Sequence, residues 1–474
     1  MSQLLIWFWP SRQRCRRLWR GEGGGRELMR LSLPLILSNS FWTMQIVMDR
    51  VFLSWYSSDA VGAAMAAVLI FWTPMALFQS TANYATTFVA QYSGANRPQR
   101  VGAAIWQSMY FSLGSGLAFF GLLIFGEQLV VWGGHSAEVQ RLEWEYLRCL
   151  TFAALPTLIV ASASSFFGGR GDSWTVLLIN AVGLAVNVVL DYVLIFGYWG
   201  FPAMGIAGAG WATVAGASAS AIVALALLWR QQFRAEFATL SAWRWDRDLF
   251  GRLLRFGLPS GLQTALDVLA FTVFLFLVGR FGAAELAATS IAFTINMAAF
   301  MPTLGISQGI MILVGQRLGQ DRPDLAERTT WTGFGLAWCY MTIMALLYLC
   351  LPGLFLALFQ GEHDRHAASL AEFVPVLLRF VAIYSLFDSM SLVFAFALKG
   401  AGDTRFVTVV SLLMSWPIMV LPTWATWYYD WGLYWAWGFA SAYIILLGFV
   451  FLLRFWLGPW RGMRVIEAAP AVTG

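Results

Sequence analysis

The chain has 474 residues, of which 59% are hydrophobic and 12% are charged, with a net charge of +5 at pH 7. Soluble domains carry about 25% charged residues, so this composition excludes an ordinary soluble domain and predicts a protein embedded in lipid. The basic residues lie in short segments between apolar runs and form no basic, aromatic groove, so we expect no nucleic-acid partner. Four cysteines without CxxC spacing predict neither a disulfide framework nor a zinc site.

Twelve apolar segments are long enough to cross a bilayer as helices, for which about 20 residues suffice. They fall at 31–54, 60–90, 101–132, 142–167, 174–197, 203–229, 253–279, 285–315, 327–358, 370–398, 406–428 and 434–457. The sequence therefore predicts an all-α membrane protein with twelve transmembrane helices. Its expected parts are a basic cytoplasmic segment (1–30, with a disordered tail as the alternative), an N-lobe of six helices (31–229), a cytoplasmic linker (230–252), a C-lobe of six helices (253–457) and a cytoplasmic tail (458–474).

Basic residues indicate the orientation of these segments. Most of the 30 lysines and arginines lie in the N-terminal segment and in alternate connections, and the opposite set of connections holds few. Because cytoplasmic loops carry the excess of lysine and arginine, both termini are predicted to be cytoplasmic. We expect the protein in the cell inner membrane.

The two halves repeat. An offset of 225 relates Val89, Gln91, Gly94, Arg97 and Pro98 to Val314, Gln316, Gly319, Arg322 and Pro323, and Pro34 to Pro259. An offset of 231 relates Gly169, Gly171 and Asp172 to Gly400, Gly402 and Asp403. Since each repeat holds six spans, both halves have the same orientation. A pseudo-twofold axis along the membrane normal follows, and with it a cavity between the halves.

Four acidic residues lie well inside the predicted spans, namely Asp49, Asp191, Asp267 and Asp388. Each costs about 2.5–3.5 kcal/mol at the centre of a membrane helix, so something must compensate them. The functional interpretation is a set of carboxylates that exchange Na+ or H+, and the structural alternative is pairing, for instance of Asp49 with Arg50. None of the four recurs at the repeat offset, although loops and glycines do.

Polar residues stand one helical turn before three of these carboxylates. Asn187 precedes Asp191, Gln263 precedes Asp267 and Tyr384 precedes Asp388, each by four residues. Each pair therefore shares a helix face. Such oxygen-rich pairs suit Na+ and also stabilise a protonated carboxyl, so they do not choose between the two ions. Gln45 and Gln263 are the polar candidates for contact with a substrate in the cavity.

Other signals favour simpler interpretations. His135, His363 and His366 fall in predicted outer loops, and we interpret His363–His366 as a solvated loop rather than a metal site. The triplet Arg170–Asp172 is expected to be a cytoplasmic turn. No phosphate-binding glycine motif is present, and no histidine or cysteine accompanies the four carboxylates. We therefore expect no ATP hydrolysis, no enzymatic activity, no cofactor and no metal other than Na+ at the coupling sites.

Taken together, these residues resemble the multidrug and toxic compound extrusion (MATE) family of transporters over residues 27–457. The resemblance rests on Leu33-Pro34, Val89-Ala90-Gln91, Gly169–Asp172, Asn187–Gly197, Gly205–Thr213, Gly257-Leu258-Pro259 and Lys399–Arg405. It implies a V-shaped fold of two helical lobes, and antiport of drugs or toxic metabolites against Na+ or H+.

The resemblance also implies two sets of coupling residues. In family members an N-lobe site uses positions that match Asp49, Asn187, Asp191 and Thr213, and in the NorM-like branch a C-lobe site uses positions that match Asp267, Tyr384 and Asp388. The chain carries both sets and so combines features of the NorM-like and DinF-like branches. Arg50 departs from the small or hydroxyl residue expected after the first aspartate, and it could neutralise Asp49.

The leading hypothesis is a monomeric exporter of small organic cations that works by alternating access in the lipid bilayer. The alternative is a flippase for lipid-linked saccharides of the same superfamily. An arginine-rich cavity would favour this alternative, and Arg50 is the only residue that points to it. A non-transporting scaffold or receptor gives no reason for four carboxylates inside the membrane.

Overall fold

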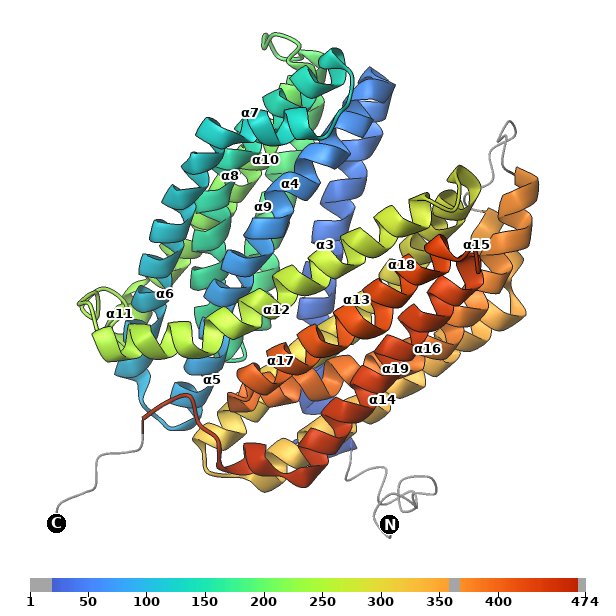
Figure 1. Cartoon of the computed structure of the whole chain (residues 1–474). Helices are drawn as coiled ribbons and strands as arrows, with labels where there is room; N and C mark the ends of the chain where they lie inside the picture. Colours follow the sequence, from blue (N-terminus) through green and yellow to red (C-terminus); the bar gives the residue numbers. More distant parts are fainter. Residues whose placement is uncertain (1–18, 358–366, 468–474) are drawn as a thin grey trace, which may run out of the picture. The chain divides into compact units, whose positions relative to one another are not determined.

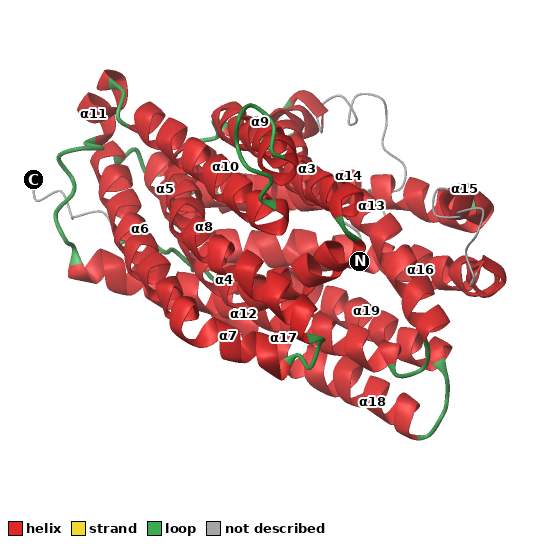
Figure 2. Cartoon of the chain, turned by 90° about the horizontal axis from the view of Figure 1, so that it is seen from above, coloured by secondary structure: helices red, strands yellow, loops and turns green. Residues whose placement is uncertain are grey.

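The computed structural model of the chain describes residues 19–357 and 367–467. Within those residues the secondary structure consists of helices joined by turns and loops (Figure 2). Twelve helical segments are long and apolar enough to span a membrane, and each overlaps one of the twelve predicted segments. The all-α class and the twelve spans are therefore confirmed, and the chain is a multi-pass membrane protein.

The first six spans and the linker are formed by the following helices, labelled in Figure 1: α3 (Gly25–Tyr56), α4 (Ser58–Asn83) with α5 (Ala85–Gly94), α6 (Pro98–Ala118) with η1 (Phe119–Gly121) and α7 (Leu122–Trp132), α8 (Ala137–Gly169), α9 (Ser173–Phe196), α10 (Gly205–Leu228) and, in the linker, α11 (Gln231–Phe237).

The second six spans are formed by α12 (Arg247–Gly279), α13 (Ala283–Gly319), α14 (Pro323–Cys350), with α15 (Pro352–Ala357) in the connection that follows, α16 (Ala367–Ala401), α17 (Thr404–Met414) with the π-helical turn η2 (Ser415–Val420) and α18 (Leu421–Tyr428), and α19 (Leu433–Leu457). A short 3-10 helix, η3 (Pro459–Gly462), comes after the last span.

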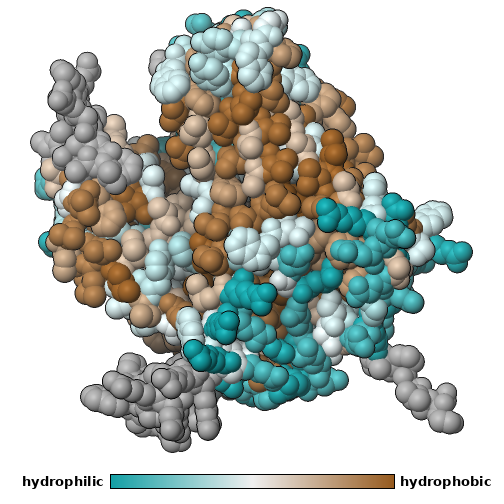
Figure 3. Space-filling model, turned by 180° about the vertical axis from the view of Figure 1, so that it is seen from behind, coloured by the Kyte–Doolittle hydropathy of each residue, from teal (hydrophilic) through white to brown (hydrophobic). Residues whose placement is uncertain are grey.

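Large apolar side chains remain exposed along these helices, as a lipid-facing surface requires. Figure 3 shows a broad band of hydrophobic residues on one face of the molecule, with hydrophilic residues gathered below it. Tryptophans such as Trp132 and Trp199 are 80% and 77% exposed near the ends of spans. Amphipathic rings at these positions are typical of anchors at the membrane–water interface.

The repeated motifs have matching local geometry. Asn96 and Asp321 have φ values of 54° and 55°, immediately before the arginine–proline pairs that begin α6 and α14. Gly171 and Gly402 have φ values of 88° and 107° in the turns before α9 and α17, where a glycine avoids steric strain. The Asp172 side chain accepts a hydrogen bond from the Thr175 N–H at the start of α9. The interpretation of Arg170–Asp172 as a turn is confirmed.

One helix is central in each half. α8 packs against α4, α6 and α10, and α16 packs against α13, α14 and α19. Each central helix is thus the fourth of its repeat and touches the second, third and sixth. Of the residues in the most apolar window of each, 61% are buried in α8 and 67% in α16, more than in most other spans. A side chain on α8 or α16 is therefore held by protein on several sides.

The chain divides into two compact units whose borders differ from the two halves of the sequence. Among the described residues, the first unit contains 37–265 and 465–467, and the second contains 19–36, 266–357 and 367–464. Helices α3 and α12, which open the two repeats, both pass from one unit to the other close to their internal prolines, Pro34 and Pro259.

Glycines lie at the contacts that the beginnings of α3 and α12 make within these units. In the second unit, a Cβ added to Gly309 of α13 would lie 2.3 Å from Ser32 Oγ of α3. In the first unit, a Cβ added to Gly257 of α12 would lie 3.4 Å from Tyr84 Cβ. The offset of 225 relates Ser32 to Gly257 and Tyr84 to Gly309, so the two contacts are equivalent. In one contact the glycine lies on α13, and in the other it lies on α12. Each allows close approach of two helices.

The last described residues pack on the first unit. Val465 is buried and its N–H donates to Gln91 Oε1 over 2.9 Å. The Glu467 carboxylate accepts hydrogen bonds from Tyr92 (2.6 Å) and Arg100 (3.0 Å) and pairs with Arg252. Partial burial alone raises the pKa of Glu467, but the hydrogen bonds from Tyr92 and Arg252 lower it to about 2. This acidic residue is therefore held as a carboxylate.

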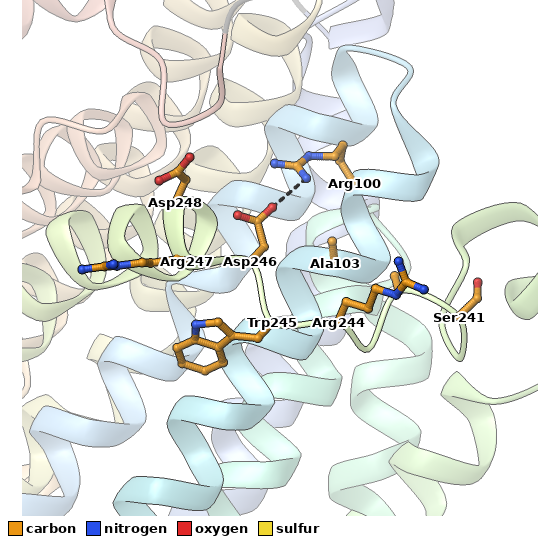
Figure 4. Close-up of a pocket in the computed structure, with 9 residues that line it drawn as sticks. Arg100, Ala103, Ser241, Arg244, Trp245, Asp246, Arg247 and Asp248 are labelled. Carbon is orange, nitrogen blue, oxygen red and sulfur yellow. Dashed lines mark hydrogen bonds and ion pairs between the residues drawn. The ribbon is translucent and has the colours of Figure 1, made fainter.

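The same arginine joins the linker to α6. Arg100 forms an ion pair of 2.9 Å with Asp246, beside a surface pocket that Arg244, Trp245 and Arg247 also line (Figure 4). None of the predicted coupling residues lines this pocket. This pocket is therefore separate from the predicted coupling residues.

Candidate functional site

In the first unit, glycines bring α9 and α10 together. A Cβ added to Gly183 of α9 would lie 2.2 Å from Ser220 Oγ, and one added to Gly216 of α10 would lie 2.8 Å from the Gly183 carbonyl oxygen and 2.9 Å from Asn187 Cβ. Ser220 Oγ donates to the Ile179 carbonyl over 2.9 Å. Since backbones can approach this closely only at small residues, the pattern fixes the face of α9 that turns inward.

That inward face carries Asn187 and Asp191, both fully buried. The Asp49 carboxyl of α3 lies close enough to interact directly with both side chains. Yet both oxygens of Asp191, Oδ1 of Asp49 and both polar atoms of the Asn187 amide are buried with no hydrogen-bond partner of normal geometry in the part of the chain that the structure describes. The three side chains are neighbours that do not satisfy one another.

Tyr146 completes this cluster from the central helix α8. It is 3% exposed, its hydroxyl lies beside Thr213 of α10, and the charges of Asp49 and Asp191 act on it. The Thr213 hydroxyl donates to the Ala209 carbonyl over 3.1 Å. The structure therefore brings together Asp49, Asn187, Asp191 and Thr213, as the sequence predicts, and adds a tyrosine.

Arg50 does not neutralise this cluster by pairing. Its side chain is exposed, and among the described residues it forms no ion pair. The structural alternative, in which Asp49 is present to pair with Arg50, lacks the contact that it needs.

The second unit holds the other two carboxylates. Tyr384 of α16 is 3% exposed and its hydroxyl accepts a hydrogen bond of 3.2 Å from the Asn296 amide of α13. Asp388, one turn further along α16, makes no hydrogen bond or ion pair within residues 19–357 and 367–467. Its charge acts on Tyr384. The predicted Tyr384–Asp388 pair therefore lies inside the unit with an unpaired carboxyl.

Asp267 approaches the same region from α12. The charges of Asp267 and Asp388 both act on Tyr443 of α19, which places this tyrosine near each carboxyl. The charge of Asp267 also acts on the ammonium group of Lys399, a 7% exposed residue near the end of α16. The sequence places Lys399 in a connection after a span that ends at 398, but α16 continues to Ala401 and buries it. The basic residue near the second cluster is thus buried, whereas Arg50 beside the first cluster is exposed.

The remaining candidates are two glutamines and the three histidines. Gln263 is 9% exposed on α12 and Gln45 is half-buried on α3, and each stays a candidate for substrate contact. His135 approaches Glu143, its Nδ1 lying 2.6 Å from Oε1. His363 and His366 lie outside the described residues. Where side chains are described, no group of three histidine, cysteine or acidic residues could hold a metal ion.

The first cluster has the chemistry of a cation site. Two adjacent buried carboxyls cannot both carry a negative charge cheaply, and a proton or a cation between them removes the repulsion. Carboxyl, amide and hydroxyl oxygens are the ligands that hard cations prefer. The unsatisfied polar atoms of Asp49, Asn187 and Asp191 fit such an occupant, because buried polar atoms are otherwise paired.

Four participants were missed from the sequence: Tyr146, Asn296, Tyr443 and Lys399. A polar residue inside an apolar span is the signal that could have singled out the first three. Their spacing in the sequence is uninformative, because each lies on a different helix from the site residue that it approaches, which is Tyr384 for Asn296 and an aspartate for the two tyrosines. Lys399 could have been noticed as the single lysine of the chain.

A family model described as MatE matches residues 34–193 and 259–424. The two matches begin 225 residues apart and end 231 residues apart, which are the two offsets of the internal repeat. Each match therefore covers one repeat.

Curated relatives cover most of the chain. A probable multidrug resistance protein NorM of Rhizobium meliloti is 29% identical over 443 residues, covering 90% of this chain and 91% of that protein. A protein with the same name from Brucella suis is 26% identical over 400 residues, covering 83% and 85%.

Solved structures share the fold at 19% identity, covering 94% of this chain and 98% of theirs. They include a MOP superfamily transporter from Pyrococcus furiosus, with a TM-score of 0.84, and an outward-facing multidrug resistance MATE family transporter, with a TM-score of 0.85. Because the MatE model matches well over half of the residues, once in each repeat, the chain belongs to the MatE family, the MATE transporters that its sequence resembles.

Proposed function

We propose that this protein is a secondary active transporter that exports small organic cations in exchange for Na+ or H+ by alternating access. The coupling residues are Asp49, Asn187, Asp191 and Thr213 in the first unit and Asp267, Tyr384 and Asp388 in the second. It works as a monomer in the inner membrane, with both termini in the cytoplasm. The names of the NorM relatives support multidrug export as its role.

The observation that carries the proposal is the first cluster. Asp49 and Asp191 are neighbours inside the membrane, and their buried oxygens lack hydrogen bonds in the described part of the chain. A structural role would provide partners for them, because an unpaired buried charge is strongly destabilising. An exchangeable cation provides a partner in one state and leaves in another. Coupling needs only that the cation and the drug prefer different conformations.

The test is efflux of ethidium from proteoliposomes that contain the purified protein, under an imposed Na+ or H+ gradient. Asp49→Asn, Asp191→Asn and Asp388→Asn remove one charge each and preserve shape. Asp59→Asn, at the exposed start of α4, is the matched control. We expect gradient-driven efflux in the wild type and the control, and its loss in at least one cluster variant.

Two outcomes would contradict the proposal. If every Asp→Asn variant retained the wild-type flux, the carboxylates would not couple transport. If the wild type moved no organic cation under either gradient, a flippase for lipid-linked saccharides would become the better hypothesis, and labelled lipid-linked saccharides would be assayed in the same vesicles.

A further inference from the structure

The linker is fastened along one face of α6 in the first unit. Three α6 side chains donate hydrogen bonds to backbone carbonyls of the linker: Trp106 to Thr239 (2.8 Å), Gln107 to Arg244 (3.1 Å) and Tyr110 to Trp243. α6 also approaches the end of α11 closely, since a Cβ added to Gly102 would lie 2.1 Å from the Phe237 carbonyl oxygen. The linker therefore has a fixed course beside α6, and its outward side chains form a defined surface.

The same face of α6 faces lipid further along the helix. Tyr110 is followed at intervals of three and four residues by Leu113 and Leu117, which are 40% and 59% exposed. This spacing places all three on one side of the helix. The span that begins with α6 has 35 residues, or about 52 Å at 1.5 Å per residue, whereas the hydrocarbon core is about 30 Å thick. The first turns of α6 and the linker beside them therefore lie at the border between hydrocarbon and water.

Exposed tryptophans stand on this part of the linker. Trp243 and Trp245 are 59% and 56% exposed, although an indole ring has a large apolar area. The Trp245 ring is held in place, with its centre 4.4 Å from that of Phe250 and 5.5 Å from that of Tyr110. Tryptophan is enriched at membrane–water interfaces, because its ring is apolar and its N–H is polar. Rings presented in this way fit the headgroup layer of a bilayer.

Two arginines lie on either side of Trp245. Arg244 and Arg247 are exposed and form no ion pair in the described part of the chain. Figure 4 shows their guanidinium groups pointing in opposite directions, with the Trp245 ring between them. All three residues line the surface pocket, which has a volume of about 470 Å³. A guanidinium presents several N–H donors in one plane, which matches the oxygens of a phosphate group.

The acidic residues of the pocket do not cancel these two charges. Asp246 accepts hydrogen bonds from Arg100 (2.9 Å) and from the Leu249 N–H (3.0 Å), so its carboxylate is satisfied. Asp248 points away from Trp245 (Figure 4). The exposed charge on either side of the ring is therefore positive, and its complement is an anion.

We propose that Trp243, Arg244, Trp245 and Arg247 form a docking surface for anionic phospholipid, with the indole rings among the headgroups and each guanidinium paired with a lipid phosphate. Charge complementarity selects anionic headgroups over zwitterionic ones, whose own ammonium competes for the phosphate. Because α12 begins at Arg247, the bound lipid holds the start of this helix at the membrane surface. This lipid surface is independent of the proposed antiport.

The test is native mass spectrometry of the purified full chain in detergent, titrated with phosphatidylglycerol or with phosphatidylcholine. The wild type should bind phosphatidylglycerol more tightly. Arg244→Gln with Arg247→Gln should weaken that binding by roughly tenfold, because each arginine beside an anionic lipid strengthens binding several-fold. The matched control is Arg26→Gln with Arg30→Gln, which removes two exposed arginines from α3 and should keep the wild-type affinity. Trp245→Ser should weaken the binding of both lipids, because it removes apolar contact and no charge.

Hydrogen exchange locates the bound lipid. Phosphatidylglycerol should slow the exchange of backbone amides at 239–250 in the wild type and not in the double variant at Arg244 and Arg247. Equal weakening by the α3 control would show that positive charge elsewhere on the protein attracts the lipid as well, and would overturn the site. A wild type without preference for phosphatidylglycerol would overturn it too. If inorganic phosphate at the same concentration protected 239–250 equally, the arginines would form a site for a free anion and not for a lipid.

Discussion

The two units use one scaffold and two different arrangements of charge. In the first, Asp49 and Asp191 are neighbours on α3 and α9, and the adjacent Arg50 is exposed and forms no ion pair among the described residues. In the second, Asp267 and Asp388 lie on α12 and α16, and Lys399 shares the cluster. Asp49 and Asp267 lie at different levels of the equivalent helices α3 and α12, whereas Asp191 and Asp388 lie on helices that are not equivalent. Asp267 corresponds to position 42, seven residues before Asp49, or about 10 Å along the helix.

This difference shows which features of the repeat serve folding and which serve chemistry. The turns before α9 and α17 and the central positions of α8 and α16 are preserved between the halves. The intramembrane charges are not. Charge is costly in lipid and is retained where it has a task, so after duplication each copy can keep or lose it independently.

The largest expected effect comes from removing both carboxylates of the first cluster. Asp49→Asn with Asp191→Asn should reduce ethidium efflux to the passive leak under every gradient, because no carboxylate remains there to bind a cation. Efflux from proteoliposomes measures this, with Asp59→Asn as control. If the double variant kept gradient-driven efflux at the wild-type rate, coupling would lie in the second unit alone. The second cluster, and not the first, would then be the coupling site.

A smaller effect is expected from filling the contact that brings α9 and α10 together. Gly183→Ala places a methyl group 2.2 Å from Ser220 Oγ and should cost about 1–3 kcal/mol of stability by overpacking. Gly62→Ala, in a helix with open space around the glycine, is the control and should not destabilise. The measurement is the free energy of unfolding in detergent. An unchanged value for Gly183→Ala would mean that α9 can shift without disturbing Asn187 and Asp191.

The tyrosines allow a finer comparison of the two clusters. Tyr146→Phe removes one hydroxyl beside Asp49 and Asp191, and Tyr443→Phe removes one beside Asp267 and Asp388. A hydrogen bond contributes about 1 kcal/mol, so each should weaken the apparent affinity for the coupling ion by roughly fivefold. The ion concentration that gives half-maximal efflux measures it. If only Tyr146→Phe has an effect, the first cluster binds the ion and the second does not.

The smallest effect concerns the cytoplasmic attachment at Glu467. Its pKa of about 2 lies below the ordinary value of 4.5. A lowered pKa gives stabilisation that is complete above pH 4.5 and is lost as the pH falls through the folded value. The attachment should therefore weaken between about pH 4.5 and pH 2, by roughly 1 kcal/mol because the group is partly exposed.

Hydrogen exchange at the Val465 amide measures this attachment, since that N–H is bonded to Gln91. Glu467→Gln should expose the amide at neutral pH and remove the pH dependence. The control is Asp321→Asn, which removes the partner of Arg464 from an 88% exposed position and should change nothing at Val465. Equal protection in the wild type and Glu467→Gln would show that Val465 holds the segment without the carboxylate.

The sequence by itself determined the twelve spans, the two repeats and the positions of the four aspartates. These follow from local properties: a run of apolar residues must cross the membrane as a helix, and an acidic residue inside it is conspicuous. The tertiary structure decided which carboxylates meet. That Asp49 lies against Asp191 while Asp267 has Lys399 nearby depends on glycine contacts and on helices more than a hundred residues apart in the chain. The exchange of the first parts of α3 and α12 is equally invisible in the sequence, because hydropathy records how far a helix extends in lipid and not which neighbours it packs against.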